Sequence, residues 1–573
     1  MAGGEVLRRW LTNGRAAMRR SLAAVVEEVR PPSGLVPRLQ WAATALLVLA
    51  AVTYTIAFLA TQTKGLFDVY TLEWDACGQL LPTFRYHGSG LFRDDINVEL
   101  RHAMTTPLWN LYYWVGTFFT SANVLSKLLP FALFVFTVWQ GFMFGRRLGG
   151  AALGAAVAIV LVHHFGVWDR MLGSNPRAFA YPLVVAFLRY SVEQAERRTL
   201  VTLVLQAAAY PTSFLCCFPA YGLMLLRRRE RGPWLRYLVA GVVAGGIVFA
   251  HTSTWSARVG KPINVAAQGM EQFTLKTFGT ALEDTAHDFY AESGKPLSAK
   301  VHRWKGQSGR AISWAIVFTL LGVAIPRLRR FPLAWPALIA TSVLAFYVSR
   351  AVALRLHLPE RMLEFTFPSL FLLGVPVLAW LAFERELKAW AGHAAAVVVA
   401  ALFLGLWGTG IPAGQYLKVW KTEVTPIVKF AATLPEGAHL AQKAWPASFV
   451  QTFARRKMLF SYMTNVGFFD KFNVEMDARV AGFYDAYYAA DLTPLKELAG
   501  RYRLTHLIVD TRDLGAEAEY RAMSDRGIAK RWKERARQLI RTNKARGFAL
   551  AAPPPQAVVF SDGPVKVLDL SKL

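Results

Sequence analysis

Six carboxylates stand among aromatic residues in segment 63–123, directly after the first apolar stretch of the chain. They are Asp68, Glu73, Asp75, Asp94, Asp95 and Glu99. A carboxylate beside apolar walls has a raised pKa and can act as a general base near neutral pH. Clustered carboxylates can also bind a hard cation through their oxygens. This segment is therefore expected to supply a base or a cation ligand.

Glu73 and Asp75 are the first candidates for the base. Two residues apart, they point in different directions on a helix but share one face of an extended segment. Asp94 and Asp95 follow a Gly-Ser-Gly turn at 88–90 in the same segment. The two acidic clusters together can chelate a divalent cation, although their spacing does not require one. Both clusters are also compatible with an ordinary solvated loop.

Cationic side chains suited to a phosphate group stand at the ends of later apolar stretches. Asp169 and Arg170 come directly after one stretch, and Arg177 opens the next in the motif SNPRAF. Guanidinium groups match phosphate oxygens, so a phosphate-bearing lipid head group is one candidate ligand. The alternative is that these side chains only anchor the chain at the interface. Arg361 and Glu364, at a late helix entry, either pair with each other or bind substrate.

The composition is typical of a polytopic membrane protein. The 573 residues are 54% hydrophobic and only 18% charged, with a mean hydropathy of +0.28. A soluble chain averages about 45–50% apolar and about 25% charged residues. The three cysteines provide neither a disulfide framework nor the spacing of metal ligands.

The formal charge of +27 does not indicate nucleic-acid binding. Arg and Lys gather in short runs at the ends of apolar stretches, as at 145–149, 193–198, 227–233, 327–331 and 383–390. Such runs are typical of cytoplasmic loops, whereas nucleic acid requires a continuous basic face. We therefore expect membrane lipid, and no nucleic acid, among the partners.

Apolar stretches of membrane-spanning length predict about eleven transmembrane helices. They lie at 41–61, 124–144, 150–166, 176–192, 234–252, 311–326, 332–349, 364–382 and 391–409, with two short helices in 199–226. The short pair is broken at Tyr210-Pro211-Thr212-Ser213. Segment 107–121 is rich in Trp and Tyr and is predicted to lie in the membrane interface.

The predicted topology divides the chain into three parts. Residues 1–40 form a cytoplasmic amphipathic segment, 41–410 a transmembrane domain with outer loops 62–123 and 253–310, and 411–573 an extracytoplasmic domain. From about Lys418 short strand patterns alternate with charged helical patterns, which predicts an α/β fold for the last domain. The fold class is thus a polytopic α-helical membrane protein with the N-terminus inside, the C-terminus outside and an α/β domain beyond the membrane.

Several motifs, in this order, resemble one family. WDACGQLLPTFRYHGSGLF resembles the acidic start, helix and glycine turn that follow the first helix of that family, and TTPLWNLYYWVG resembles its interface segment. FMFGRRLGG, YPTSFLCCFPAYGLMLLRRR and PERMLEFTFP continue the series, which covers roughly residues 40–410. The family is the GT-C superfamily of polytopic membrane glycosyltransferases, in particular the branch of aminoarabinose and protein mannosyl transferases. Trp74 separates two acids that are contiguous in the family, and Met362 replaces a tyrosine, so the chain resembles a divergent member.

This resemblance implies an enzyme of the bacterial inner membrane, a hexosyltransferase that uses a lipid-linked sugar. A sugar would pass from a polyprenyl-phosphate-linked donor to a glycan, lipid or protein acceptor on the outer face. Asp75, or Glu73 as the second choice, would be catalytic. Substrate would be bound by Asp94, Asp95, Asp169, Arg170, Arg177 and Arg361. No metal ligand is assigned, and a divalent cation is the one cofactor that the acidic clusters admit.

Other classes stay open from the sequence. A polymerase or ligase of surface polysaccharide would use similar carboxylates and arginines on its outer face. A transporter would carry ionisable residues in mid-span and internal repeats, and neither is evident in the sequence. A non-catalytic scaffold would present its last domain to a partner.

Overall fold

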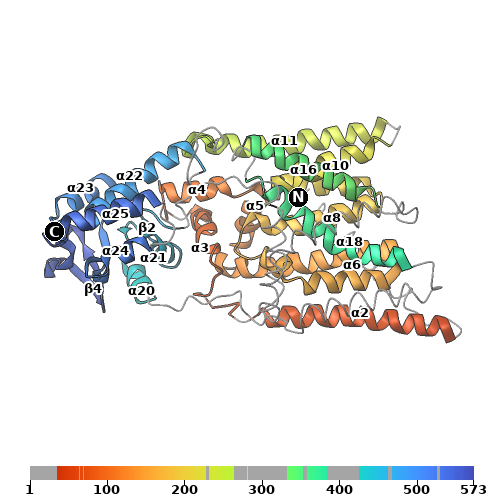
Figure 1. Ribbon diagram of the computed structural model, residues 1–573, viewed down its shortest axis with the longest axis horizontal. Helices are drawn as coiled ribbons and strands as arrows, with labels where there is room; N and C mark the ends of the chain where they lie inside the picture. Colours follow the sequence, from red (N-terminus) through yellow and green to blue (C-terminus); the bar gives the residue numbers. More distant parts are fainter. Residues whose placement is uncertain are drawn as a thin grey trace.

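The structure is a computed structural model that describes residues 35–63, 65–68, 70–88, 90–227, 231–263, 281, 332–352, 358–383, 425–462, 468–524 and 530–573. Figure 1 shows an elongated molecule with long helices at one end and a small sheet flanked by helices at the other. Short helices of the carboxylate-rich segment lie between these two ends.

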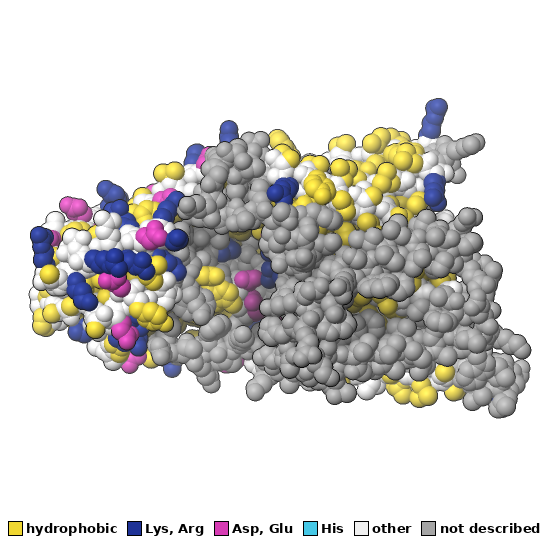
Figure 2. Space-filling model, viewed as in Figure 1, with side chains coloured by type: hydrophobic (Ala, Val, Ile, Leu, Met, Phe, Trp, Pro, Cys, Tyr) yellow, Lys and Arg dark blue, Asp and Glu magenta, His cyan; other side chains and the backbone are white. Residues whose placement is uncertain are grey.

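Five helices in the described ranges are long and apolar enough to cross a membrane. They are α2 (Leu35–Thr61), α6 (Ala122–His163), α11 (Arg231–Val259), α16 (Ala334–Ala351) and α18 (Thr366–Phe383), the last together with the short α17 (Arg361–Glu364). Along α11, Leu235, Val242 and Phe249 are exposed, and Figure 2 shows hydrophobic side chains over this helix. A continuous exposed apolar face of this length is suited to lipid. The chain is an integral membrane protein.

The helix α6 is a hairpin that contains two of the predicted spans. Its backbone leaves the helical conformation at Gly149 and Gly150, and the φ of Gly150 is 74°, a left-handed value that glycine adopts without strain. A Cβ atom on Gly145 would lie 2.9 Å from the Cα atom of Gly154. Because these residues have no side chains, the two arms of the hairpin can approach closely, as membrane helices do at small residues.

Three shorter helices follow the hairpin: α8 (Ala180–Val192), α9 (Glu196–Ala209) and α10 (Pro211–Leu225). The expected break between the paired short helices is present at Tyr210, whose φ and ψ are −153° and 87°. The predicted spans 311–326 and 391–409 lie outside the described residues, as does most of the predicted outer loop 253–310. The count of about eleven helices and the sidedness of the chain therefore stay predictions.

Between α2 and α6 the carboxylate-rich segment folds into α3 (Ala76–Gln79), η1 (Leu81–Gly88), α4 (Ile96–Met104) and α5 (Pro107–Gly116). Pro107 occupies the first turn of α5, where its fixed φ favours a helix and its missing N–H costs nothing. Trp109 and Tyr113, one helical turn apart, are fully buried. The segment predicted to lie in the membrane interface thus contains a helix that packs one aromatic face against the protein.

The C-terminal end of the molecule contains a five-stranded sheet with the order β2-β1-β3-β5-β4. Its elements, in chain order, are α20 (Thr425–Thr433), β1 (His439–Ala441), α21 (Ala444–Phe449), η5 (Val450–Ala454), β2 (Lys457–Met458), α22 (Asp470–Tyr487), α23 (Thr493–Tyr502), β3 (His506–Asp510), η6 (Thr511–Leu514), α24 (Ala518–Met523), α25 (Lys530–Asn543), β4 (Val558–Asp562) and β5 (Val565–Asp569). Strand β1 pairs in parallel with β2 and β3, whereas β5 runs antiparallel to β3 and β4. Helices cross between the parallel strands, as parallel pairing requires.

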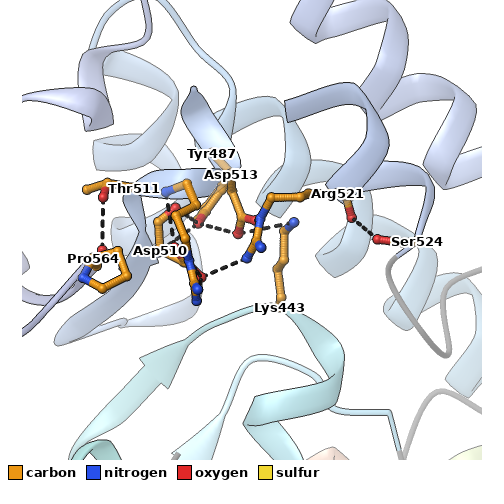
Figure 3. A network of polar contacts seen from close by, with 9 residues as sticks. Lys443, Tyr487, Asp510, Thr511, Asp513, Arg521, Ser524 and Pro564 are labelled. Carbon is orange, nitrogen blue, oxygen red and sulfur yellow. Dashed lines mark hydrogen bonds and ion pairs between the residues drawn. The ribbon is translucent and has the colours of Figure 1, made fainter. Parts of the chain in front are cut away.

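A polar network closes the end of the sheet where β1 and β3 stop (Figure 3). The Asp513 side chain is 3% exposed, and its oxygens lie 3.1 Å from Nζ of Lys443 and 2.6 Å from Nε of Arg521. Arg521 also lies 2.7 Å from Asp510, and the Tyr487 hydroxyl donates to Asp513 at 3.1 Å. Because Lys443 follows β1 and Asp513 follows β3, the network ties two neighbouring strands together at their carboxyl ends.

Candidate active site

Asp75 lies at the start of α3, and its carboxylate is held through one oxygen. Oδ2 accepts a hydrogen bond from Nδ2 of Asn175 at 2.8 Å and another from Arg177 at 2.9 Å. The side chain is 34% exposed. An accessible carboxylate oxygen can accept a proton from a ligand. The structure thus places two predicted site residues, Asp75 and Arg177, in direct contact.

Glu73 lies behind Asp75 and has a different electrostatic environment. Its Oε2 accepts a hydrogen bond from the backbone N–H of Asp75 at 2.7 Å. Burial, followed by the charge of Asp75, raises the pKa of Glu73 to about 8, while the charge of Arg177 opposes this rise. A pKa near 8 favours the protonated form of Glu73 at neutral pH.

Gly173 permits the close approach of the loop that carries Asn175 and Arg177. Its φ is +79°, and a Cβ atom there would lie 2.4 Å from Oε2 of Glu73 and 2.8 Å from Cβ of Asp75. Any side chain at this position would displace the two carboxylates. The backbone oxygen of the next residue, Ser174, accepts a hydrogen bond from Nε1 of Trp109 at 2.5 Å, so α5 holds the loop from its other side.

A second charged cluster contains two more of the predicted cations. Arg170 lies 3.1 Å from Oε1 of Glu364, and Arg361 contacts Oε2 of the same carboxylate. The Tyr181 hydroxyl donates to the backbone oxygen of Glu364 at 3.3 Å. The ion pair considered for the helix entry is therefore present. Two guanidinium groups share one carboxylate.

Asp169 belongs to the same region as the acidic pair. It ends α7 (Phe165–Asp169), and its charge contributes to the raised pKa of Glu73. The neighbouring Arg170 reaches the Glu364 cluster. Asp169 thus lies near Glu73, and its neighbour Arg170 contacts Glu364.

Asp94 and Asp95 are placed differently from the other predicted residues. Asp95 is buried and caps α4, because its Oδ1 accepts the backbone N–H of Asn97 at 2.8 Å. Burial raises the pKa of Asp95. Asp94 is exposed at a φ of 57°. Within the described ranges, no recorded hydrogen bond or ion pair joins either residue to Asp75, so their role in substrate binding stays a prediction.

The predicted divalent cation also stays a prediction. The described residues contain no group of three or more His, Cys, Asp or Glu side chains placed to hold a metal ion. Asp95 is used as a helix cap rather than facing Asp75. The two acidic clusters that suggested chelation therefore do not converge in the described part of the chain.

Three residues around the acidic pair were missed by sequence reasoning. Gln79 donates from Nε2 to Oδ1 of Asn175 at 2.7 Å, and Gly173 packs against both acids. Asn175 and Gly173 stand in GSNPRAF, a turn-forming run whose polar members could have been noted beside Arg177. Gln79 carries no such signal, because its role depends on a partner 96 positions away.

Arg101 is a further residue that the sequence did not single out. It lies on α4, is 5% exposed, and its Nε finds no hydrogen-bond partner among the described residues. Burial lowers the pKa of Arg101 to about 10, and the charge of Asp75 opposes this change. A buried cation of the carboxylate-rich segment therefore stands near the candidate base.

The C-terminal end of the molecule forms one wall of the site. The Trp74 ring, between the two acids in sequence, lies 5.5 Å from the ring of Phe449 and 5.2 Å from that of Tyr462. The Thr452 hydroxyl donates to the backbone oxygen of Cys77. Segments that are more than 370 residues apart in the chain therefore meet at α3.

The fold is similar to solved structures, whereas no family model and no curated relative matches the sequence. Archaeal oligosaccharyltransferase AglB from Archaeoglobus fulgidus, in complex with an inhibitory peptide and a dolichol-phosphate, has a TM-score of 0.51 and 10% identity, covering 85% of this chain and 71% of that chain. The apo form of the Archaeoglobus fulgidus oligosaccharyltransferase has a TM-score of 0.50 and 11% identity, covering 87% and 72%. ArnT from Cupriavidus metallidurans bound to undecaprenyl phosphate has a TM-score of 0.47 and 13% identity, covering 90% and 97%.

The chain therefore has a GT-C fold in a divergent form, as its motifs led us to expect. This is the fold of polytopic membrane glycosyltransferases. At 10–11% identity the similarity concerns the fold, and a common fold does not by itself establish a common activity. The activity has to be argued from the site.

Proposed function

We propose that this protein is a glycosyltransferase that moves a sugar from a polyprenyl-phosphate-linked donor to an acceptor on the outer face of the membrane. The observation that carries the proposal is the contact of Asp75 with Arg177 beside the cluster of Arg170, Arg361 and Glu364. It combines an accessible base with cations suited to a phosphate, next to helices of membrane-spanning length.

In the proposed reaction, Asp75 accepts the proton of the acceptor hydroxyl. The hydroxyl oxygen forms a bond to the anomeric carbon of the sugar, and the bond from this carbon to the phosphate oxygen breaks. The electron pair of the broken bond stays on the lipid phosphate, which leaves as an anion. Arg170 and Arg361, which both contact Glu364, stabilise this anion, because guanidinium groups match the oxygens of a phosphate.

Glu73 has a separate part in this proposal. With its pKa raised to about 8, it is neutral at physiological pH and does not compete with Asp75 for cations. Its Oε2 accepts the backbone N–H of Asp75, which fixes the start of α3. We therefore place Asp75 first as the base, and Glu73 supports its position.

The test is transfer of radiolabelled sugar by the purified full chain in lipid nanodiscs, from the polyprenyl-phosphate-linked sugars of its source membranes. The substitution Asp75→Asn keeps the shape of the side chain and removes the base. We expect transfer to fall by about 10²–10⁴-fold, the usual contribution of a positioned general base. Asp562→Asn, at an exposed carboxylate in β4, is the matched control and should retain transfer.

Two outcomes would contradict the proposal. Full transfer by the Asp75→Asn variant would remove Asp75 from the chemistry. A folded wild-type protein that transfers sugar from none of these donors would favour the transporter or scaffold classes instead.

A further inference from the structure

The two oxygens of the Asp75 carboxylate are not equivalent in this structure. Oδ2 accepts hydrogen bonds from Asn175 and Arg177 at 2.8 Å and 2.9 Å. Oδ1 accepts none from any residue in the described ranges. A carboxylate oxygen has two lone-pair directions, so the two donors fill the capacity of Oδ2. The oxygen that remains able to take a proton is Oδ1.

The Asn175 amide lies between the Asp75 carboxylate, which accepts from its Nδ2, and Gln79, which donates to its Oδ1. Nε2 of Gln79 donates to Oδ1 of Asn175 at 2.7 Å, which turns the NH2 group of Asn175 toward Asp75. The reverse orientation would bring the amide oxygen of Asn175 against a carboxylate oxygen and would leave Gln79 without an acceptor. Gln79 and Asn175 are 6% and 9% exposed, so water does not readily replace these bonds.

The parts of this arrangement come from two distant segments. Gln79 and Asp75 are four residues apart, and the backbone N–H of Gln79 donates to the backbone carbonyl oxygen of Asp75 at 3.1 Å. Asn175 bridges both side chains from a loop about 100 positions later. Gly173 lets this loop approach within contact of Asp75, and Trp109 holds its backbone. The loop therefore has little freedom to carry Asn175 away from the carboxylate.

We propose that Asn175, oriented by Gln79, is a positioning residue that presents Oδ1 of Asp75 to the acceptor hydroxyl. This inference rests on the proposed function of Asp75 as the base. In the reaction, the acceptor proton passes to Oδ1 while Oδ2 stays bound to Asn175 and Arg177. Asn175 itself touches neither the transferred sugar nor the breaking bond. Its effect is on the direction in which Asp75 accepts the proton.

The kinetic test uses Asn175→Leu and Gln79→Leu in the same transfer assay. Without the amide donor, Asp75 can rotate about its side-chain bonds, and a misplacement of about 1 Å at a reacting group can cost about a hundredfold in rate. We expect kcat to fall about a hundredfold for Asn175→Leu and less for Gln79→Leu, which only releases the amide. The KM for the lipid-linked donor should change less than about threefold, because no phosphate-binding residue is altered.

The second test does not depend on sugar transfer. N,N′-dicyclohexylcarbodiimide reacts with protonated carboxyl groups, and mass spectrometry of the labelled full chain locates the modified position as pH is varied. In Asn175→Asp a second carboxylate replaces the amide donor against Oδ2, which favours the protonated form of the pair. Labelling at 75 or 175 should therefore extend at least one pH unit higher than labelling at 75 in the wild type.

The matched control is Asn543→Asp. Nδ2 of Asn543 also donates to an oxygen, the backbone oxygen of Tyr488 at 2.9 Å, but in the C-terminal end of the molecule. This variant should leave the labelling at 75 unchanged. The proposal is overturned if Asn175→Asp labels as this control does, or if Asn175→Leu keeps its kcat. If the wild type transfers no sugar, the labelling result still decides whether Asn175 governs the Asp75 carboxylate.

Discussion

At the scale of single residues, burial separates two carboxylates that look alike in the sequence. Glu73 and Asp75 are two positions apart, yet Asp75 is paired with Arg177, whereas desolvation raises the pKa of Glu73. A buried carboxylate favours its neutral form, and a neighbouring negative charge strengthens this preference. One member of the pair therefore holds a proton at neutral pH while the other is stabilised by a cation.

The protonation of Glu73 leads to a pH-dependent stability. Its pKa rises from 4.5 to about 8 on folding, through burial and the charges of Asp75 and Asp169, against the charge of Arg177. Between these pH values the folded state holds one more proton than the unfolded state, so stability falls as pH rises, by about 1.4 kcal/mol per pH unit for this group. Glu73→Gln should remove this loss and melt at a higher temperature than the wild type at pH 8.

Thermal unfolding of both proteins in nanodiscs at pH 5, 6.5 and 8 checks this prediction. The advantage of Glu73→Gln should shrink toward pH 5, which approaches the pKa of 4.5 in the unfolded state, where the difference in bound protons between the two states disappears. Glu497→Gln, at an exposed position of α23, is the control and should follow the wild type at each pH. An equal gap between Glu73→Gln and wild type at all three pH values would show that Glu73 is ionised in the folded protein.

Gly173 gives a second prediction at this scale. Gly173→Ala places a methyl group 2.4 Å from Oε2 of Glu73, and Gly547 has the same φ of +79° with nothing within 4 Å of an added Cβ. Both substitutions incur the left-handed backbone cost of about 1–2 kcal/mol. Only Gly173→Ala should also abolish most of the transfer activity, because it displaces the acidic pair. Equal transfer by the two variants would show that the close contact has no functional role.

At the scale of elements, short helices and loops carry the candidate site residues, and the long helices pack around them. Asp75 directly precedes α3 and Gln79 ends it, and Arg361 and Glu364 belong to α17; both helices are only four residues long. Isolated helices of this length are unstable in water, so packing and side-chain bonds must hold them. The GT-C frame supplies this packing by burying the loops between the membrane helices and the C-terminal sheet.

The side-chain bonds around Asp513 are expected to stabilise the sheet at the C-terminal end. Asp513 contacts Lys443, Arg521 and Tyr487 from different elements (Figure 3). Asp513→Ala leaves two cations without their buried partner, which typically costs about 3–5 kcal/mol. We expect the C-terminal end to unfold at a lower urea concentration and to be cleaved sooner by protease. Unchanged proteolysis, compared with Asp562→Asn, would show that the network is dispensable.

At the scale of the whole molecule, the carboxylate-rich segment and the C-terminal end of the molecule, which are far apart in the sequence, meet at one site. The ring of Phe449 lies 5.5 Å from that of Trp74, and Nδ2 of Asn97 donates to the backbone oxygen of Met458 at 2.9 Å. Figure 1 shows the corresponding elements, α21 and β2, next to α3 and α4. The C-terminal end therefore contacts the carboxylate-rich segment that carries the candidate base.

Phe449→Ala tests this connection. Phe449 is 3% exposed, and removing a buried phenyl ring typically lowers the free energy of unfolding by about 3–5 kcal/mol. The loss should also weaken the packing of Trp74. Hydrogen exchange should become faster in residues 70–80, and transfer should fall about tenfold or more. Phe560→Ala, which removes a ring stacked 4.6 Å from Phe430, is the control and should affect only the C-terminal end. Unchanged hydrogen exchange in residues 70–80 would mean that the packing of Phe449 does not affect the segment that carries Asp75.

The sequence by itself determined the membrane class, because apolar stretches and charge placement report directly on lipid. It also indicated Asp75, Arg170 and Arg177 as candidates, because a carboxylate can act as a base and guanidinium groups match phosphate oxygens. The order of short motifs was enough to suggest the GT-C fold, which the structure confirms. These features are local, and local pattern is what a sequence displays.

Only the tertiary structure decided which candidates meet. Gln79 and Asn175 have no distinguishing pattern, and their hydrogen bond joins positions 96 residues apart. The pair of Arg170 with Glu364 and the burial of Glu73 likewise depend on segments that fold together from distant parts of the chain. Hydrogen bonds, ion pairs and desolvation act over a few ångströms in space. A sequence orders residues along the chain, so it cannot show which of them approach to that distance.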